Sequence, residues 1–220
     1  MTTNSLPGVN EESRAIQRYL QRITVSGEGQ PCSPFGCEVY HYDVIGSTQT
    51  QAKSLADQGA PEGTLVVARR QTAGYGRKGD AWNSNHGGLW FSFILRPGFD
   101  PSRAGDFSLA CAEAIARALG DRMPRCVFEV KAPNDVLAAL PDGTKKKICG
   151  LLLEGGVKNG LYEWLVVGVG VNINNELPEE LGQQAATLEQ IHGNPVARMP
   201  VLRSVLIRLS QAYKTFSKTL

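Results

Sequence analysis

The sequence predicts an α+β fold in which a mixed or antiparallel β-sheet is covered by helices. Strand-like segments occur in adjacent groups separated by helical segments, without the strict alternation of a doubly wound fold. Two long segments with helical character, residues 103–119 and 199–216, are expected to cover this sheet. The chain has 220 residues, 42% of them hydrophobic, which is enough for one domain with a sizeable core.

The N-terminal residues 1–37 are expected to form one helix followed by a linker. Glu11 and Glu12 are acidic residues suited to a first helical turn, and apolar residues then recur at helical spacing. Gly, Pro and Ser are frequent in residues 26–36, as is typical of a loop. Because a winged-helix domain needs about three helices and a hairpin, we expect no DNA-binding domain here and a single larger domain over residues 38–220.

The remaining elements are predicted from alternation, helical periodicity and capping residues. Ser47 can cap a helix that stops before Gly59, because its hydroxyl oxygen accepts a hydrogen bond from a free backbone N–H group. A run of aromatic and aliphatic residues predicts a buried strand over residues 88–95. The full set of expected strands covers residues 38–45, 64–69, 88–95, 127–130, 148–153 and 162–171.

Composition argues against several classes of protein. The formal net charge is +2, from 23 basic and 21 acidic residues, so electrostatic attraction to nucleic acid or to a membrane surface is weak. No apolar run reaches the roughly 18 residues that indicate a membrane-spanning helix. The 5 cysteines are scattered without a Cys-x-x-Cys pair, so we expect neither a zinc site nor a disulfide framework. A reducing cytoplasm is the expected compartment.

Polar or glycine-rich segments lie next to the strands, where a simple sheet protein needs neither. Residues 46–49 stand at a strand-to-helix junction, whose free N–H groups suit a carboxylate or a polar ring. Residues 71–82 combine glycines with the cations Arg77 and Lys78, which suit a phosphate group. Residues 131–135 bring a lysine and an aspartate to the end of one strand.

A further segment, residues 168–174, has glycines at alternate strand positions. Such glycines leave one face of the strand bare, so a flat ligand or another backbone can approach closely. Each segment also has a purely structural interpretation: a helix cap at 46–49, an exposed loop at 71–82, a turn at 131–135, or a bulge at 168–174. The loop is neither a phosphate-binding P-loop nor a dinucleotide fingerprint, because the required spacings are absent.

Taken in order, these segments resemble the biotin protein ligase family, within the broader biotin/lipoate ligase group. The resemblance runs from about Tyr42 to Asn174 and implies a ligase catalytic domain over residues 38–220. The matching motifs are Ser47-Thr48-Gln49, Gln71 before Gly74-Tyr75-Gly76-Arg77, Trp82 with Gly87-Gly88-Leu89-Trp90, Lys131-Ala132-Pro133-Asn134-Asp135, Lys147-Ile148-Cys149-Gly150 and Gly168-Val169-Gly170-Val171-Asn172.

The resemblance implies an ATP-dependent reaction in two steps. Biotin and ATP, with Mg²⁺, give biotinyl-5′-AMP and pyrophosphate, and biotin then passes to one lysine of a biotin carboxyl carrier protein. Because the biotin carboxylate is already nucleophilic, the first step needs in-line positioning and neutralisation of phosphate charge rather than a strong base.

The resemblance also implies roles for individual residues, with no metal ligand among them. Arg77, Lys131, Asp135 and Lys147 are expected to act in catalysis, with Asp135 orienting either Arg77 or the incoming lysine amine. The residues expected to contact biotin are Ser47, Thr48, Gln49, Gln71, Tyr75, Gly76, Arg77, Lys147 and Gly150. Those expected to contact ATP or the adenylate are Arg77, Lys78, Trp82, Lys131, Asn134 and Asn172.

The sequence departs from the family pattern at several positions. Tyr75 stands where the family loop carries an arginine, Asp80 where a basic residue is common, and Ala132 where a tryptophan is usual. Residues 137–146 add a longer turn, and a helix ending near residue 216 leaves no room for the small C-terminal β-barrel of many relatives. The alternatives are therefore a lipoate or fatty-acyl adenylating ligase, or a catalytically impaired biotin- or adenylate-binding protein. A homodimer paired across a sheet edge is left open.

Overall fold

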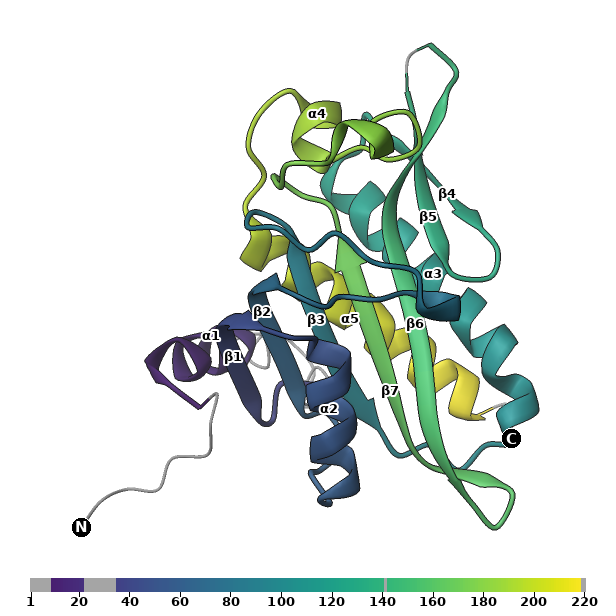
Figure 1. Cartoon of the computed structure of the whole chain (residues 1–220). Helices are drawn as coiled ribbons and strands as arrows, with labels where there is room; N and C mark the ends of the chain where they lie inside the picture. Colours follow the sequence, from purple (N-terminus) through teal and green to yellow (C-terminus); the bar gives the residue numbers. More distant parts are fainter. Residues whose placement is uncertain (1–8, 22–34, 141, 219–220) are drawn as a thin grey trace.

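The computed structural model describes residues 9–21, 35–140 and 142–218, and its centre is a mixed β-sheet (Figure 1). Within these residues the sheet has seven strands in the order β1-β2-β3-β7-β6-β5-β4. β1 pairs with β2 in parallel, and every other neighbouring pair is antiparallel. The strands are β1 (Val39–Ile45), β2 (Leu65–Gln71), β3 (Leu89–Leu95), β4 (Val127–Lys131), β5 (Asp135–Ala139), β6 (Lys145–Lys158) and β7 (Leu161–Val171).

Helices cover both faces of the sheet, which confirms the predicted α+β class. The long helices α3 and α5 pack against each other on one face, and α2 packs on the other face against β2, β3 and β7 (Figure 1). The helices are α1 (Glu11–Gln21), α2 (Thr48–Asp57), α3 (Ala104–Arg122), α4 (Leu188–His192) and α5 (Arg198–Lys218). Short 3₁₀ turns occur at η2 (Arg77–Gly79), η3 (Pro101–Arg103) and η4 (Glu179–Leu181).

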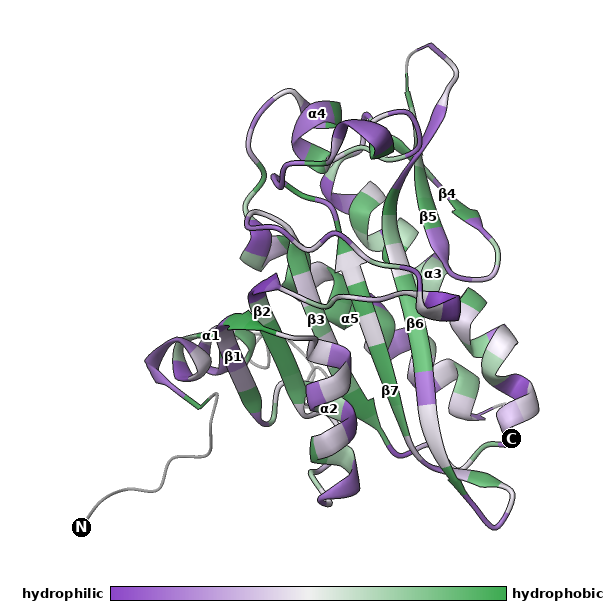
Figure 2. Cartoon of the chain, in the orientation of Figure 1, coloured by the Kyte–Doolittle hydropathy of each residue, from purple (hydrophilic) through white to green (hydrophobic). Residues whose placement is uncertain are grey.

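Alternation along the central strands separates the hydrophobic core into two parts. Val167 and Val169 of β7 join the larger core beneath α3 and α5, whereas Val166 joins a smaller core beneath α2. Figure 2 shows the resulting concentration of apolar residues along the central strands. Gly168 and Gly170 have the same strand parity as Val166, so they face the α2 side and place no side chain there.

Most expected elements are present, and two were missed. α3 continues past Gly120 to Arg122, and β6 extends in both directions beyond the expected residues 148–153. β5 was not predicted, because its alanines have low strand propensity, yet it pairs with β4 on one side and β6 on the other. The five-residue helix α4, which begins at a Thr187 capping box, was also missed. The expected turn near Gly143 joins β5 to β6.

The N-terminal helix α1 belongs to the same core as the sheet. Its Ile16 and Leu20 are buried in the larger hydrophobic cluster. The start of α1 also forms hydrogen bonds with backbone groups of β1. Asn10 Nδ2, just before the helix, donates to the His41 carbonyl (3.1 Å), and the His41 N–H donates to Ser13 Oγ (3.0 Å). The linker expected over residues 26–36 lies mostly outside the described residues. No helix in the described part of the chain has the length and apolar character of a membrane span.

Candidate active site

A cavity of about 780 Å³ lies on the α2 side of the sheet. Its floor includes Gly168 and Gly170 of β7, and its walls come from the start of α2, the glycine-rich loop and residues 131–135. Every residue that the sequence assigned to biotin, nucleotide or catalysis lines this cavity: Ser47, Thr48, Gln49, Gln71, Tyr75, Gly76, Arg77, Lys78, Trp82, Lys131, Asn134, Asp135, Lys147, Gly150 and Asn172.

One end of the cavity is a buried polar cluster at the start of α2. The Thr48 N–H donates to Gln71 Oε1 (2.7 Å), and Thr48 Oγ1 donates to the same oxygen (3.0 Å). Ser47 is the N-cap of α2. Ser92 Oγ lies 2.9 Å from Thr48 Oγ1, and it donates to Gln49 Oε1. The cluster therefore holds its donors and acceptors in fixed positions before any ligand arrives.

Ser92 was missed by the sequence reasoning. The only signal is a single hydroxyl inside the otherwise apolar strand β3, and a lone serine in a strand is common. Its strand neighbour is Gly168 of β7. A Cβ atom on Gly168 would lie 2.4 Å from Gln49 Oε1, so glycine at this position leaves room for the polar cluster.

The indole of Trp82 lies on the bare surface that two glycines provide. Gly150 of β6 and Gly170 of β7 are direct cross-strand partners. A Cβ on Gly170 would come within 2.5 Å of Trp82 Nε1, and a Cβ on Gly150 within 3.0 Å of the ring. The sequence predicted that a flat ligand or another backbone could approach this strand face closely, and the structure places a side chain of the protein itself, the Trp82 indole, there. No described residue accepts a hydrogen bond from the buried Trp82 Nε1.

Lys147 is held between a carboxylate and an aromatic ring. Its Nζ lies 2.7 Å from Asp135 Oδ1 and 4.8 Å from the centroid of the Trp82 ring. The first contact is an ion pair, and the second is a cation–π contact. β5 and β6 pair with Asp135 opposite Gly150, so the carboxylate lies beside the strand that carries Lys147.

Arg77 reaches the same wall of the cavity from the glycine-rich loop. Its Nη1 donates to Asn134 Oδ1 at 3.1 Å. The expectation that Asp135 orients Arg77 is wrong. The adjacent Asn134 accepts the hydrogen bond from the guanidinium, and Asp135 pairs with Lys147 instead. Arg77 and Lys147 are 70 positions apart in the sequence, yet neighbouring residues of one turn hold both, so the expected convergence of the two cations is present.

The buried cysteines are not reactive groups of this site. Cys111 and Cys149 are fully buried, and burial raises the pKa of each thiol well above its usual range. A thiolate is therefore disfavoured at both positions. Both side chains belong to the larger hydrophobic core.

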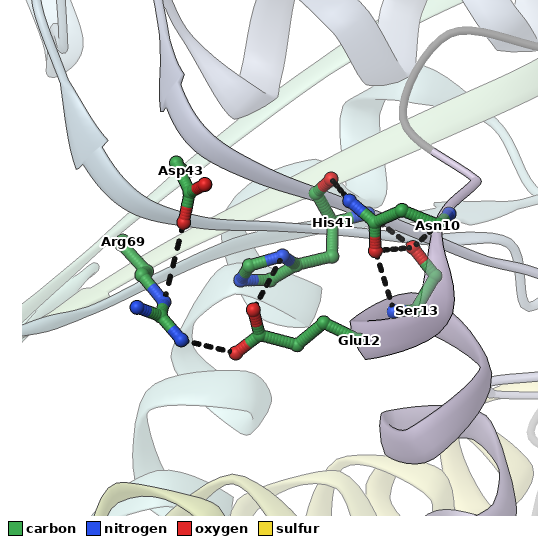
Figure 3. A network of polar contacts seen from close by, with 6 residues as sticks. All are labelled: Asn10, Glu12, Ser13, His41, Asp43 and Arg69. Carbon is green, nitrogen blue, oxygen red and sulfur yellow. Dashed lines mark hydrogen bonds and ion pairs between the residues drawn. The ribbon is translucent and has the colours of Figure 1, made fainter.

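One group of potential metal ligands lies away from the cavity, where α1 meets β1 (Figure 3). The ligand atoms of Glu12, His41 and Asp43 lie within 4.8 Å of one another. Arg69 already pairs with both carboxylates, at 2.6 Å to Glu12 and 3.4 Å to Asp43. Because the guanidinium would repel a metal cation, this network is better suited to docking α1 than to holding a metal.

Comparison with known proteins gives a consistent result. The model of the biotin/lipoate A/B protein ligase family matches residues 42–172. The chain is 34% identical to the bifunctional ligase/repressor BirA of Bacillus subtilis over 185 residues, which are 82% of this chain and 55% of that protein. It is 36% identical over 128 residues to the biotin–[acetyl-CoA-carboxylase] ligase of Paracoccus denitrificans, covering 58% of this chain and 51% of that ligase. The chain thus spans about half the length of these curated relatives.

Solved structures show the same fold. Biotin protein ligase from Aquifex aeolicus, in complex with biotin and ATP, superposes with a TM-score of 0.68 at 34% identity, covering 82% of this chain and 72% of that one. Biotin protein ligase from Leishmania major, in complex with biotinyl-5-AMP, superposes with a TM-score of 0.66 at 20% identity, with coverages of 80% and 75%. This chain belongs to the biotin/lipoate A/B protein ligase family.

Proposed function

We propose that the chain is a biotin protein ligase, which forms biotinyl-5′-AMP from biotin and ATP and then transfers biotin to a lysine of a carboxyl carrier protein. The single observation that carries the proposal is the meeting of Arg77 and Lys147 at one wall of a cavity that also contains a buried polar cluster. The Aquifex aeolicus relative, which is bound to biotin and ATP, supports the choice of substrates.

In the first step, the cations would offset the charge that builds up on the nucleotide phosphates. Biotin's ring would lie in the polar cluster, where Thr48 and Gln71 offer partners to its ureido group. Its carboxylate oxygen would attack the α-phosphorus of ATP and displace pyrophosphate. Arg77 and Lys147 would bind the oxygens of the reacting carboxylate and phosphate. The charge of Lys131 would add to the positive electrostatic potential around them. No strong general base is required, since the nucleophile is already ionised.

In the second step, the amine of the carrier lysine would attack the acyl carbon of biotinyl-5′-AMP. An amide bond forms, the bond between the acyl carbon and the phosphate oxygen breaks, AMP leaves, and the amine loses a proton. Asp135 is the carboxylate next to Lys147 in the cavity wall. It would orient the incoming amine, which is the second of the two roles expected for it.

Magnesium fits this cavity as an ion carried by the nucleotide. Mg²⁺ in nucleotide sites is bound mostly by phosphates and water, with one or two carboxylates from the protein. Asp80 and Asp135 are the aspartates lining the cavity, and Asp135 is already paired with Lys147. When bound with ATP, the ion would supply further neutralisation of phosphate charge. No cavity residue is proposed as its dedicated ligand.

The wider setting is part of the same proposal. We propose that residues 38–220 form the catalytic domain, that the protein acts in the cytoplasm, and that its protein partner is a biotin carboxyl carrier domain. We do not extend the repressor role named for BirA to this chain, because a net charge of +2 gives weak attraction to nucleic acid. A homodimer across a sheet edge stays a prediction.

The acid to be activated is the main alternative. A lipoate or fatty-acyl ligase could use the same cations, but an aliphatic tail would leave the buried donors and acceptors near Thr48 unpaired. Leaving buried polar groups unpaired is costly, so the polar cluster favours biotin. An impaired binding protein would need a lost catalytic group, and both Arg77 and Lys147 line the cavity.

Pyrophosphate release tests the proposal. The purified chain is incubated with ATP and Mg²⁺ together with biotin, lipoate or octanoate, and release is followed in each case. We expect release with biotin well above that with the other acids, and ATP-dependent labelling of an added carrier domain. Release that depends on lipoate or octanoate would identify the alternative ligase. Biotin binding without release or labelling would identify the impaired binding protein.

A further inference from the structure

The glycine-rich loop is closed on itself and crosses the ligand cavity. Figure 1 shows the connection between β2 and β3 passing in front of β7 to reach β6, with η2 at its far end. Its backbone is closed by hydrogen bonds from Gly76 to Asp80 (2.8 Å) and from Trp82 to Gly74 (2.9 Å). These hydrogen bonds make residues 74–82 one compact segment, so the contacts of its side chains with the rest of the protein hold it over the cavity.

Tyr75 attaches this loop to β6. Its hydroxyl donates to Glu154 Oε2 of β6 at 2.8 Å. Lys53 of α2 donates to the other oxygen of the same carboxylate, also at 2.8 Å. Glu154 therefore joins the loop, the helix that carries the polar cluster, and the central strand next to β7. Desolvation raises the pKa of Glu154, but the hydrogen bonds from Lys53, Tyr75 and Gln49 more than offset this, and the net shift is downward.

The tyrosine suits this position because it is a neutral donor. Lys53 already provides the positive charge that pairs with Glu154. An arginine at position 75 would bring a second cation to this carboxylate, so it would compete with Lys53 or turn toward the cavity. A phenol instead fills the remaining acceptor site without added charge. The departure of Tyr75 from the family pattern thus has a structural partner in this chain.

We propose that Tyr75 is a positioning residue whose hydroxyl latches the glycine-rich loop to Glu154, holding the loop over the cavity before ligand binds and slowing the release of biotin afterwards. The loop-holding part rests on the contacts above. The ligand part rests on the proposed function, because it requires that biotin occupies this cavity.

Trypsin reports on the latch in the ligand-free protein, since Arg77 and Lys78 are cleavage sites within the loop. Cleavage of a native protein tracks the population of its open form. Tyr75→Phe removes one hydrogen bond to a charged group, so cleavage after these residues should accelerate about tenfold. Tyr162→Phe, a hydroxyl removed from β7 outside the cavity lining, is the matched control and should leave cleavage unchanged. An unchanged cleavage rate in Tyr75→Phe overturns the proposal.

A double variant separates a latch from a general loss of structure. If the hydroxyl acts through Glu154, Tyr75→Phe should add nothing to the cleavage rate of Glu154→Leu, which removes both acceptor oxygens, whereas independent effects would multiply and contradict the latch. Stopped-flow measurement of biotin dissociation should show about tenfold faster release from Tyr75→Phe with a similar association rate. Equal release from both proteins overturns the ligand part. Failure of the unaltered chain to bind biotin contradicts the proposed function, while the trypsin result still decides the loop contact.

Discussion

The ammonium of Lys147 lies 2.7 Å from the carboxylate of Asp135. The pair is partly shielded, with side-chain exposures of 31% for Lys147 and 19% for Asp135. An ammonium fixed by a neighbouring carboxylate loses little freedom when a second anion arrives, so the site is organised for an anionic ligand in advance. The same pair places a carboxylate close to the position where the carrier amine is proposed to enter.

Loss of the Lys147 ammonium should strongly slow the first step, the formation of biotinyl-5′-AMP. Lys147→Gln removes a charge proposed to stabilise the transition state, so biotin-dependent pyrophosphate release should fall by about 10²–10³-fold. Lys145→Gln is the matched control on the same strand, because Lys145 pairs with Glu129 at the surface and does not line the cavity. Equal loss in the two variants would show that the effect is not specific to the cavity cation.

Removing the charge of Asp135 should slow carrier labelling more than adenylate formation. Asp135→Asn keeps the size of the side chain, but the neutral amide cannot form an ion pair with Lys147 and has no negative charge with which to orient an amine. We expect transfer from preformed biotinyl-5′-AMP to fall by about 10–100-fold, with a smaller change in pyrophosphate release. Glu129→Gln, which removes the carboxylate paired with Lys145, is the control. An unaltered transfer rate in Asp135→Asn would contradict the role given to this residue.

A methyl group on the cavity floor should displace Trp82. Gly170→Ala would bring a Cβ within 2.5 Å of the indole nitrogen, so the ring or the strand must shift. We expect a loss of about 1–3 kcal/mol in the free energy of unfolding, together with weaker biotin binding measured by calorimetry. Gly120→Ala is the control: it lies within α3, and beyond its chain neighbours and the helix's own backbone no atom lies within 4 Å of an added Cβ, so it should stabilise the chain by up to about 1 kcal/mol. Normal biotin affinity in Gly170→Ala would show that the floor is not part of the binding site.

Acidification should loosen α1 at the network in Figure 3. Burial lowers the pKa of His41 below its ordinary 6.5, against an opposing contribution from Glu12. Burial raises the pKa of Glu12, but the hydrogen bond and charge of Arg69 and the charge of His41 lower it overall. Both groups bind protons more readily in the unfolded state, so stability falls as the pH decreases: below 6.5 for His41 and below 4.5 for Glu12.

Hydrogen exchange of α1 amides at pH 7.5, 6 and 5 measures this effect. Exchange rates, corrected for the intrinsic effect of pH, should rise relative to those of α3. His41→Gln should remove the part of the change that occurs between pH 6.5 and 5, and His192→Gln should leave it in place. An α1 whose corrected exchange does not depend on pH would contradict the account of this contact.

The sequence predicted the cavity better than the contacts inside it. Ordered motifs identify which loops carry ligand groups, and strand alternation then requires Gly168 and Gly170 to share a face, so the lining could be anticipated. The ion pair between Asp135 and Lys147 could not be anticipated, because it depends on the pairing of β5 with β6, and β5 has weak strand propensity. Glu154 was missed for a related reason: a carboxylate in the middle of a strand has no sequence feature that distinguishes it from a solvated one.

The most direct test of the central claim is a crystal structure of the chain grown with biotin, ATP and Mg²⁺. The account predicts biotinyl-5′-AMP in the cavity, with the guanidinium of Arg77 and the ammonium of Lys147 both within hydrogen-bonding distance of oxygens at the acyl–phosphate linkage. A ligand bound elsewhere, or a linkage in the cavity that neither cation contacts, would contradict it.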